Sequence, residues 1–207
     1  MTVKKSMKDP LNVIIAGVGG QGNIVISSLI GAALVKKGYF VVVGETYGAS
    51  QRGGAVVSHV RISKETQYGP LIPDGCADII LGMEPAETLR ALGQFGNPNV
   101  LTIVNPRPIY PLSVLSGEGE YPDISNLVET IKELSDKTWV INATEEAQKL
   151  GNPMFANVLL IGALIALGML PLDKKSLEPV LEERFPKAFE ANMGAFKRGA
   201  ELAGQIR

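Results

Sequence analysis

The stretch "IIAGVGGQGNIVI", residues 14–26, decides the fold. The run Val13–Ala16 is apolar, rich in β-branched residues and ended by a glycine, which is typical of a strand buried on both faces. A glycine loop follows, and residues 24–37 then repeat apolar side chains at helical spacing. Gly38 stands where a glycine commonly ends a helix. The stretch therefore predicts a strand, a tight loop and a helix.

The loop contains the pattern G-x-G-x-x-G at Gly17, Gly19 and Gly22. Such glycines permit a tight turn, and backbone N–H groups at the start of the following helix can hold a pyrophosphate. Glu45 lies about twenty residues further on, where a dinucleotide-binding domain carries its ribose-binding acid. Three interpretations stay open from these residues: an NAD site, a site for another phosphate-bearing group, and a purely structural turn.

The rest of the chain alternates between strand and helix patterns. We expect strands at 39–45, 55–63, 77–82, 99–105 and 138–143, and helices at 84–92, 123–136, 144–151, 152–170 and in two segments from Ser176 that break at Pro186. Strand 55–63 follows its predecessor too soon for a crossover helix, so this pair is predicted to be antiparallel. The fold class is α/β: a three-layer α/β/α Rossmann-like domain with a mostly parallel, mixed sheet.

Two segments of the chain need separate treatment. Residues 106–122 are rich in proline and glycine, which predicts a surface or interface segment without a regular helix. Residues 152–170 are strongly apolar but lack basic flanks, so a buried core helix is favoured over a membrane span or a helix at a subunit interface. We expect one domain over 1–207, with a helical C-terminal part at about 144–207.

Composition limits the possible functions. The formal net charge is −1, which gives no general attraction to nucleic acid or to an anionic membrane. No apolar leader follows the polar first ten residues, so we expect a cytoplasmic protein. The single cysteine, Cys76, cannot supply the four thiolates of an iron–sulfur cluster and is read as inert. The single histidine, His59, lies in an expected strand and is interpreted as a packed structural residue.

A second loop, "ETYGASQRGG" at 45–54, is the more unusual feature. It places four residues among glycines at the end of an expected strand, where open α/β sheets form their ligand crevice: Tyr47, Ser50, Gln51 and Arg52. The planar guanidinium of Arg52 suits a phosphate or a carboxylate. A solvated or interface arginine is the alternative for this position.

Five stretches resemble one family, in its order and over nearly the whole chain. They are "GVGGQGNIVISSLIGAAL", "GETYGASQRGGAVVSHVRI", "PDGCADIILGMEPAETLRAL", "VNPRPIYP" and "NVLLIGALIALG". Together they resemble the gamma-type subunit of 2-oxoacid:ferredoxin oxidoreductases, most closely the beta subunit of the indolepyruvate enzymes. The resemblance implies the domain III fold of pyruvate:ferredoxin oxidoreductase. "SQRGG" followed by a strand and then by "ADIILGMEPAE" distinguishes this family from NAD dehydrogenases, which share only the glycines.

The resemblance implies a subunit of an enzyme that decarboxylates 2-oxoacids oxidatively, joins the acyl group to coenzyme A and passes electrons to ferredoxin. Thiamine diphosphate, Mg and 4Fe-4S clusters are then expected in a large alpha subunit, and none of them is expected to be bound by this chain alone. The chain is expected to be inactive by itself. A stand-alone dinucleotide-binding or regulatory Rossmann-like protein is the competing function.

Within such a complex, both glycine loops are expected to adjoin the entrance for substrate and coenzyme A. The candidate cofactor-binding residues are Gly17, Gly19, Gly20, Gln21, Gly22, Ser50, Gln51, Arg52 and Gly53. No residue is assigned as a catalytic residue or as a metal ligand. The apolar helix from Phe155 to Leu170 and the proline-rich segment around Arg107 are predicted to help dock the large subunit.

Overall fold

A six-stranded mixed sheet forms the centre of the computed structural model, which describes residues 8–48 and 53–206. The strands are β1 (Leu11–Val18), β2 (Phe40–Tyr47), β3 (Ala55–Ser63), β4 (Ile79–Gly82), β5 (Leu101–Val104) and β6 (Lys137–Val140). Their order is β2-β3-β1-β4-β5-β6, with β1, β4, β5 and β6 mutually parallel. β3 lies between β1 and β2 and is antiparallel to both, so the predicted mixed sheet and its antiparallel pair are confirmed.

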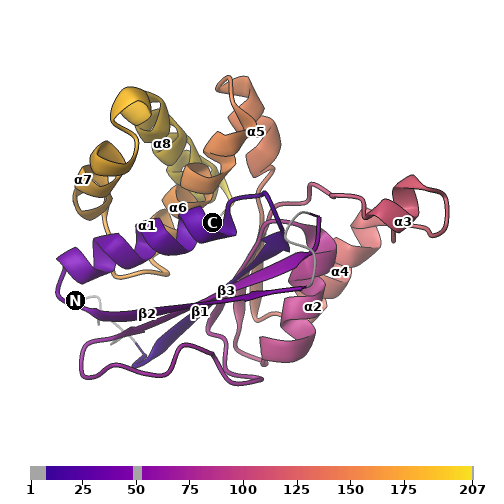
Figure 1. Cartoon of the computed structure of the whole chain (residues 1–207), viewed down its shortest axis with the longest axis horizontal. Helices are drawn as coiled ribbons and strands as arrows, with labels where there is room; N and C mark the ends of the chain where they lie inside the picture. The colour runs from indigo at the N-terminus through magenta and orange to yellow at the C-terminus, as the bar shows by residue number, and fades with distance from the viewer. Residues whose placement is uncertain (1–7, 49–52, 207) are drawn as a thin grey trace.

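Helices cover both faces of this sheet (Figure 1). They are α1 (Asn23–Lys36), α2 (Pro85–Phe95), α3 (Leu112–Leu115), α4 (Ile124–Glu133), α5 (Ala143–Lys149), α6 (Ala156–Ala166), α7 (Lys174–Arg184) and α8 (Phe189–Gln205), with short 3-10 helices η1 (Pro153–Phe155) and η2 (Pro186–Ala188). α1, α5, α6, α7 and α8 lie on one face, while α2 and α4 lie on the other. The predicted three-layer architecture is therefore confirmed.

The side chains of β1 alternate between two hydrophobic cores. Val13 and Ile15 pack with α1 and α6 in the larger core, whereas Ile14 and Ala16 pack with α2 and α4 in the smaller one. All eight residues of β1 are buried, as expected for a central strand with helices on both of its faces. The strand is longer than predicted because pairing with β3 extends over its whole length, from Leu11 to Val18.

The apolar helix α6 is buried inside this chain. Its residues from Ala156 to Leu164 are all buried, and it packs along α8. The backbones approach closely, since a Cβ added to Gly199 would lie 1.8 Å from the carbonyl oxygen of Leu159. The predicted core helix is therefore confirmed, and its contribution to docking a partner stays a prediction, confined to the half-buried residues at its two ends, Phe155 and 165–167. No helix among the described residues is long and apolar enough to cross a membrane.

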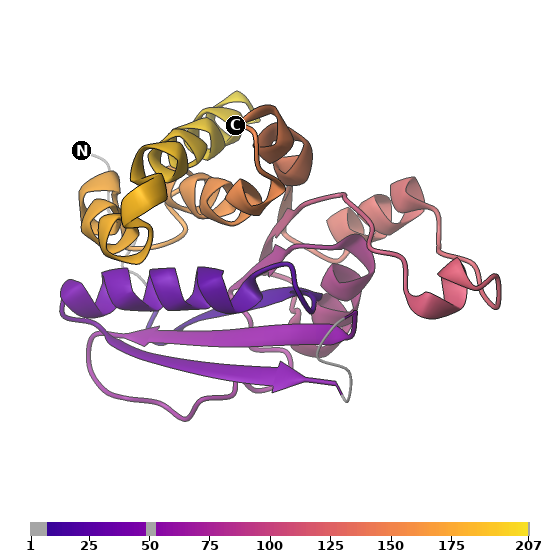
Figure 2. The same cartoon turned by 45° about the horizontal axis from the view of Figure 1, so that its top comes forward.

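Residues 106–122 form an arm that projects from the body of the molecule (Figure 2). The expectation that this arm contains no regular helix is wrong, because α3 forms one turn directly after Pro111. Proline is tolerated just before or at the first turn of a helix, so the residues between Pro111 and Gly117 are free to turn. α3 has no buried residue, and Leu112 and Leu115 are 80% and 69% exposed.

Candidate functional site

The loop between β1 and α1 is braced by the side chain of Gln21. The backbone N–H of Val18 donates to Gln21 Oε1 at 2.7 Å, and Gln21 Nε2 donates to the carbonyl of Met83 at 2.9 Å. Gly20 and Gly22 have φ values of 105° and 93°, which side-chain-bearing residues rarely adopt. Gln21, predicted to bind a cofactor, thus has both of its amide atoms engaged within the loop and with the residue that follows β4.

Gly17 is explained by packing. A Cβ at this position would lie 2.8 Å from Cβ of Met83 and 2.7 Å from Gln21 Oε1. The missing side chain therefore lets the end of β1 approach the segment after β4. The first glycine of the motif has this role whether or not a ligand binds.

The two predicted glycine loops meet through their backbones. The N–H of Gly19 donates to the carbonyl of Gly54 at 2.8 Å, and the N–H of Gly53 donates to the carbonyl of Gly19 at 3.4 Å. The antiparallel strand β3 causes this contact, because it begins beside the carboxyl end of β1. Ser50, Gln51 and Arg52 lie outside the described residues, and their assignment as site residues stays a prediction.

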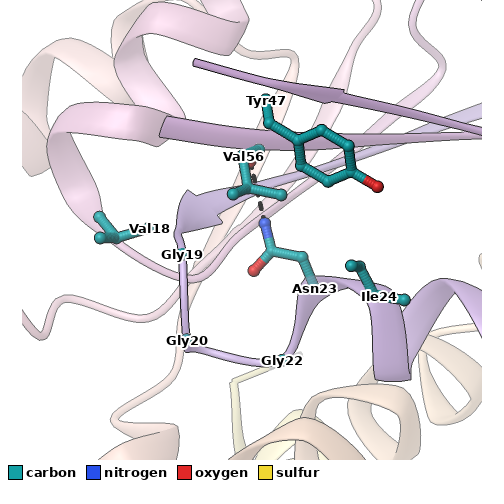
Figure 3. A pocket seen from close by; sticks show the side chains of 8 residues that line it. All are labelled: Val18, Gly19, Gly20, Gly22, Asn23, Ile24, Tyr47 and Val56. Carbon is teal, nitrogen blue, oxygen red and sulfur yellow. Dashed lines mark hydrogen bonds between the residues drawn. The ribbon is translucent and has the colours of Figure 1, made fainter. Parts of the chain in front are cut away.

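A pocket of about 430 Å³ opens beside the start of α1 (Figure 3). Its lining consists of Val18, Gly19, Gly20, Gly22, Asn23, Ile24, Tyr47 and Val56. Asn23 Nδ2 donates to the carbonyl of Val56 at 3.0 Å and so ties α1 to β3. α1 has no side-chain cap and no acidic residue in its first turn, which leaves its positive end open to an anion.

Sequence reasoning missed Asn23 and Val56 as parts of this pocket. Asn23 had a detectable signal, a polar residue at the first position of the expected helix. Val56 had none, because only the strand order brings it beside the loop.

Glu45 does not occupy the position of a ribose-binding acid. β3 separates β2 from β1, so the end of β2 is displaced from the glycine loop by one strand. Glu45 Oε1 accepts a hydrogen bond from the Ser27 hydroxyl at 2.9 Å, and Oε2 accepts one from the Ser58 hydroxyl. The carboxylate therefore joins α1 to the sheet, and this chain lacks the strand arrangement on which the NAD interpretation depends.

A buried acid, Glu84, lies on the other side of the β1 end. It is 1% exposed and caps α2 by accepting from the backbone N–H of Glu87 at 2.9 Å. Its second oxygen accepts from the Tyr121 hydroxyl and, at 3.4 Å, from the N–H of Ile109. Glu84 thus links the arm to the body through these two hydrogen bonds. The dipeptide Glu84–Pro85 indicates a helix start in the sequence, but nothing there indicates the pairing with Tyr121.

Glu84 and Glu87 line a cavity of about 460 Å³ between the arm and α2. Burial raises the pKa of the Glu87 carboxyl, whereas Arg90, with its Nη1 at 2.5 Å from Oε1, acts to lower it. This cavity therefore has an acidic lining on one wall.

His59 is packed in the protein interior, as the sequence predicts. Its Nδ1 accepts from the backbone N–H of Ile72 at 3.3 Å, and its ring meets that of Phe95 edge-on with centroids 5.1 Å apart. Burial lowers the pKa of the imidazole. Within residues 8–48 and 53–206, no three His, Cys, Asp or Glu side chains gather in a group that could hold a metal ion.

Comparison with known proteins gives consistent results over nearly the whole chain. Residues 12–202 match the family described as pyruvate ferredoxin/flavodoxin oxidoreductase. The chain is 37% identical over 194 residues to indolepyruvate oxidoreductase subunit IorB of Archaeoglobus fulgidus, covering 93% of this chain and 95% of that subunit. It is 38% identical over 197 residues to the Pyrococcus horikoshii subunit of the same name, with 94% and 96% covered.

Solved structures share the fold. The gamma subunit of a keto/oxoacid ferredoxin oxidoreductase from Geobacter sulfurreducens superimposes with a TM-score of 0.68 at 25% identity, covering 94% of this chain and 99% of that one. A 2-oxoglutarate:ferredoxin oxidoreductase chain from Magnetococcus marinus gives a TM-score of 0.75 at 24% identity. The match covers 97% of this chain but 32% of that longer one, so a similar unit is built into a larger polypeptide there.

Proposed function

Because this chain belongs to the pyruvate ferredoxin/flavodoxin oxidoreductase family, we propose that it is the non-redox subunit of a cytoplasmic 2-oxoacid:ferredoxin oxidoreductase acting on indolepyruvate or a related arylpyruvate. In the reaction the bond between the carboxylate and the oxo carbon breaks and carbon dioxide leaves. The acyl carbon is oxidised and bonds to the sulfur of coenzyme A, while the released electrons reduce ferredoxin. The chain is inactive alone.

The substrate assignment is supported by sequence identity, which is higher to an indolepyruvate oxidoreductase subunit than to a 2-oxoglutarate synthase subunit of the same organism. Identity is 37% to the A. fulgidus indolepyruvate oxidoreductase subunit but 30% to the A. fulgidus 2-oxoglutarate synthase subunit KorC. Both matches cover more than nine tenths of each protein, so the difference reflects divergence along the whole chain and not a missing segment.

The residues of this chain leave the redox groups to a partner. A 4Fe-4S cluster needs four thiolates, and the sequence has one cysteine. The proposed large alpha subunit holds thiamine diphosphate with Mg, which supplies carbanion stabilisation, and the clusters that conduct electrons to ferredoxin. The role left for this chain is to bind coenzyme A, to cover the active site of the large subunit and to orient the reactants there.

We assign the pocket beside α1 to the entrance for coenzyme A. The open positive end of α1 and the left-handed glycines Gly20 and Gly22 suit a phosphate that approaches the backbone closely. Gln21 braces the loop in this arrangement, and Arg52 is the expected anion contact. In the assembled complex, Arg52→Ala is expected to raise the KM for coenzyme A about tenfold or more while kcat changes less.

The control for this experiment is Arg184→Ala, which removes an exposed arginine at the end of α7. Size-exclusion chromatography first establishes that both variants assemble. Unchanged coenzyme A kinetics in an intact Arg52→Ala complex would contradict the assignment.

The arm is the proposed docking element for the large subunit. Leu112 and Leu115 are the two most exposed large apolar side chains among the described residues, and they share one turn of α3. Replacing both by serine is expected to leave the melting temperature of the free chain unchanged and to weaken assembly at least tenfold, since buried apolar anchors dominate interfaces. Leu134→Ser, which alters an exposed leucine at the end of α4, serves as the matched control.

The competing function, a stand-alone dinucleotide-binding protein, is tested by calorimetric titration of the free chain with NADH. No heat of binding is expected, because Glu45 is engaged by Ser27 and Ser58. Tight binding would overturn the proposed function.

A further inference from the structure

The first turn of α1 presents backbone donors that the described residues leave unused. The N–H groups of Gly22, Asn23 and Ile24 donate to no acceptor within residues 8–48 and 53–206. Gly22, the residue that precedes the helix, has no side chain that could cap it, and the first turn contains no acidic residue. Such a helix end carries roughly half an elementary positive charge and favours an anion.

Asn23 adds a buried acceptor at the same place. The residue is 3% exposed, and its Oδ1 accepts no hydrogen bond from any residue that the structure describes. The orientation of the amide is fixed, because Nδ2 donates to the carbonyl of Val56 at 3.0 Å and a carbonyl cannot donate in return. Figure 3 shows Oδ1 directed toward the glycine loop. An unpaired buried acceptor is unfavourable, so this oxygen indicates a donor that is brought to it.

The glycines leave room around this oxygen. A Cβ on Gly17 would lie 2.9 Å from Asn23 Oδ1, so any side chain at position 17 would crowd it. A Cβ on Gly20 would have no heavy atom within 4 Å, which leaves the loop open at that point. On the other side of the same pocket, Ile24 and Tyr47 are both exposed. The pocket therefore has a polar end at the glycine loop and an apolar end at Tyr47.

The donor and the anion can be specified further. An amide oxygen accepts from an O–H or an N–H, and an ammonium group would be repelled by the positive end of α1, so the donor is neutral. Asn23 supplies both Oδ1 and one of the free N–H groups, so the donor and the anion are neighbours in the ligand. A phosphate on a sugar ring, with a free hydroxyl on the next carbon, has both groups in this arrangement.

We propose that the pocket beside α1 binds the ribose 3′-phosphate of a nucleotide and that Asn23 selects it. The free N–H groups hold the phosphate, and Asn23 Oδ1 accepts from the neighbouring 2′-hydroxyl. The base packs against the ring of Tyr47, since every base has a face that stacks on aromatic side chains. Coenzyme A carries a ribose 3′-phosphate, so the inference rests on the proposed function and names the part of that molecule that enters this pocket.

The test is calorimetric titration of the full-length chain with three nucleotides. Adenosine 3′-monophosphate is expected to bind. 2′-Deoxyadenosine 3′-monophosphate differs from it by one hydroxyl and is expected to bind at least about tenfold more weakly, because Asn23 Oδ1 then stays unpaired. Adenosine 5′-monophosphate has no hydroxyl on the carbon next to the one that carries its phosphate, and it is also expected to bind at least about tenfold more weakly.

Asn23→Leu removes the acceptor and keeps a side chain of similar size. The ratio of the dissociation constants of the 2′-deoxy and ribose 3′-monophosphates is expected to fall to about one in this variant. A purely structural role of Asn23 would leave that ratio unchanged, since losing the hydrogen bond to Val56 affects both nucleotides equally. Asn126→Leu, the same replacement in the first turn of α4, is the matched control and is expected to keep the ratio of the parent chain.

Three results would each overturn the proposal. They are no binding of adenosine 3′-monophosphate by the parent chain, equal binding of the 2′-deoxy and ribose 3′-monophosphates by the parent chain, and a ratio in Asn23→Leu as large as in the parent chain. The first two need no variant and decide the outcome even if Asn23→Leu does not fold. The coenzyme A kinetics of the assembled Arg52→Ala complex are measured separately, so a failure here is distinguishable from a failure of the proposed function.

Discussion

At the scale of single residues, two neighbouring glycines have different reasons to be glycine. Both Gly20 and Gly22 have positive φ, but a Cβ on Gly20 would meet open space, whereas one on Gly22 would collide with the amide of Asn157. Gly22 therefore joins the glycine loop to α6, which carries Asn157. A change at Gly22 should affect both, and a change at Gly20 should affect only the loop.

Gly20→Ala is expected to lower the free energy of unfolding by about 1–3 kcal/mol, the usual cost of a left-handed non-glycine residue. Gly22→Ala should cost more, because the new methyl group also displaces Asn157. Adding Asn157→Ala to Gly22→Ala should recover part of that excess, and urea titrations of the variants measure it. Equal losses in the two single variants would show that the contact with Asn157 carries no energy.

His59 makes the stability of the chain depend on pH. Burial lowers the pKa of His59 below its ordinary value of 6.5, so the unfolded chain binds this proton more readily than the folded chain. The free energy of unfolding should therefore fall as the pH drops below 6.5, and His59→Gln should remove this dependence. Glu87 has a raised pKa and contributes a slope of opposite sign, but it is present in both proteins and cancels in their difference.

Thermal unfolding of the parent chain and of His59→Gln across pH 5–7.5 is the measurement. Identical pH profiles for the two proteins would contradict the interpretation of His59 as a buried neutral group.

At the scale of secondary-structure elements, the close packing of α6 against α8 depends on a glycine, Gly199, at the point where the two backbones approach each other. Gly199→Ala would place a methyl group 1.8 Å from the carbonyl oxygen of Leu159 and force the two helices apart. We expect a loss of about 1–3 kcal/mol, as is usual for overpacking. Gly194→Ala, in the same helix but facing open space, should instead stabilise the chain by about 0.5–1 kcal/mol, because alanine favours helix.

Chemical denaturation of these two variants compares them directly, and opposite signs are expected. A loss of similar size at both positions would mean that helix propensity, and not the close crossing, decides the outcome.

The elements also show what the sequence can and cannot reveal. Asp123 caps α4 and Gly38 ends α1, as predicted, because capping depends only on neighbouring residues. β1 is longer than its apolar run suggests, since its length is set by pairing with β3. α3 escaped prediction because one turn between Pro111 and Gly117 is too short for any periodicity to be visible.

At the scale of the whole molecule, the arm is fixed to the body at a few defined contacts. Tyr121 donates to Glu84, and its ring meets that of Tyr110 edge-on with centroids 5.2 Å apart. Tyr121→Phe keeps the ring contact but leaves one oxygen of a buried carboxylate with only the long hydrogen bond from Ile109. Hydrogen exchange across residues 106–122 should accelerate severalfold, because the desolvation cost of about 1–3 kcal/mol is no longer offset.

Tyr110→Phe keeps the aromatic ring at position 110 and leaves the Tyr121 hydroxyl in place. Residues 106–122 of this variant should therefore exchange their amide hydrogens at the rate of the parent chain. If Tyr121→Phe exchanges no faster than this control, the arm is held by packing and not by Glu84.

The molecule as a whole also explains why the fold was more predictable than the site. Strand and helix patterns are local, and they were sufficient for a three-layer α/β/α domain. The pocket beside α1 depends on Val56, which only the order of the strands brings beside the glycine loop. Gln21 is predicted to bind a cofactor because it lies in the glycine loop, whereas its hydrogen bond to Met83, which follows β4, leaves no trace in the sequence.

The position of β3 has a consequence for how protein sequences are read. The same glycine pattern stands at the end of the first strand in dinucleotide-binding domains and in this chain, but here an antiparallel neighbour brings Gly54 onto the N–H of Gly19. The N–H of Gly19, which could otherwise donate to a ligand, thus donates to the carbonyl of Gly54. A sequence motif search finds the same glycine pattern in both cases. Telling the two apart requires one further piece of information, the identity of the strand that lies beside the motif.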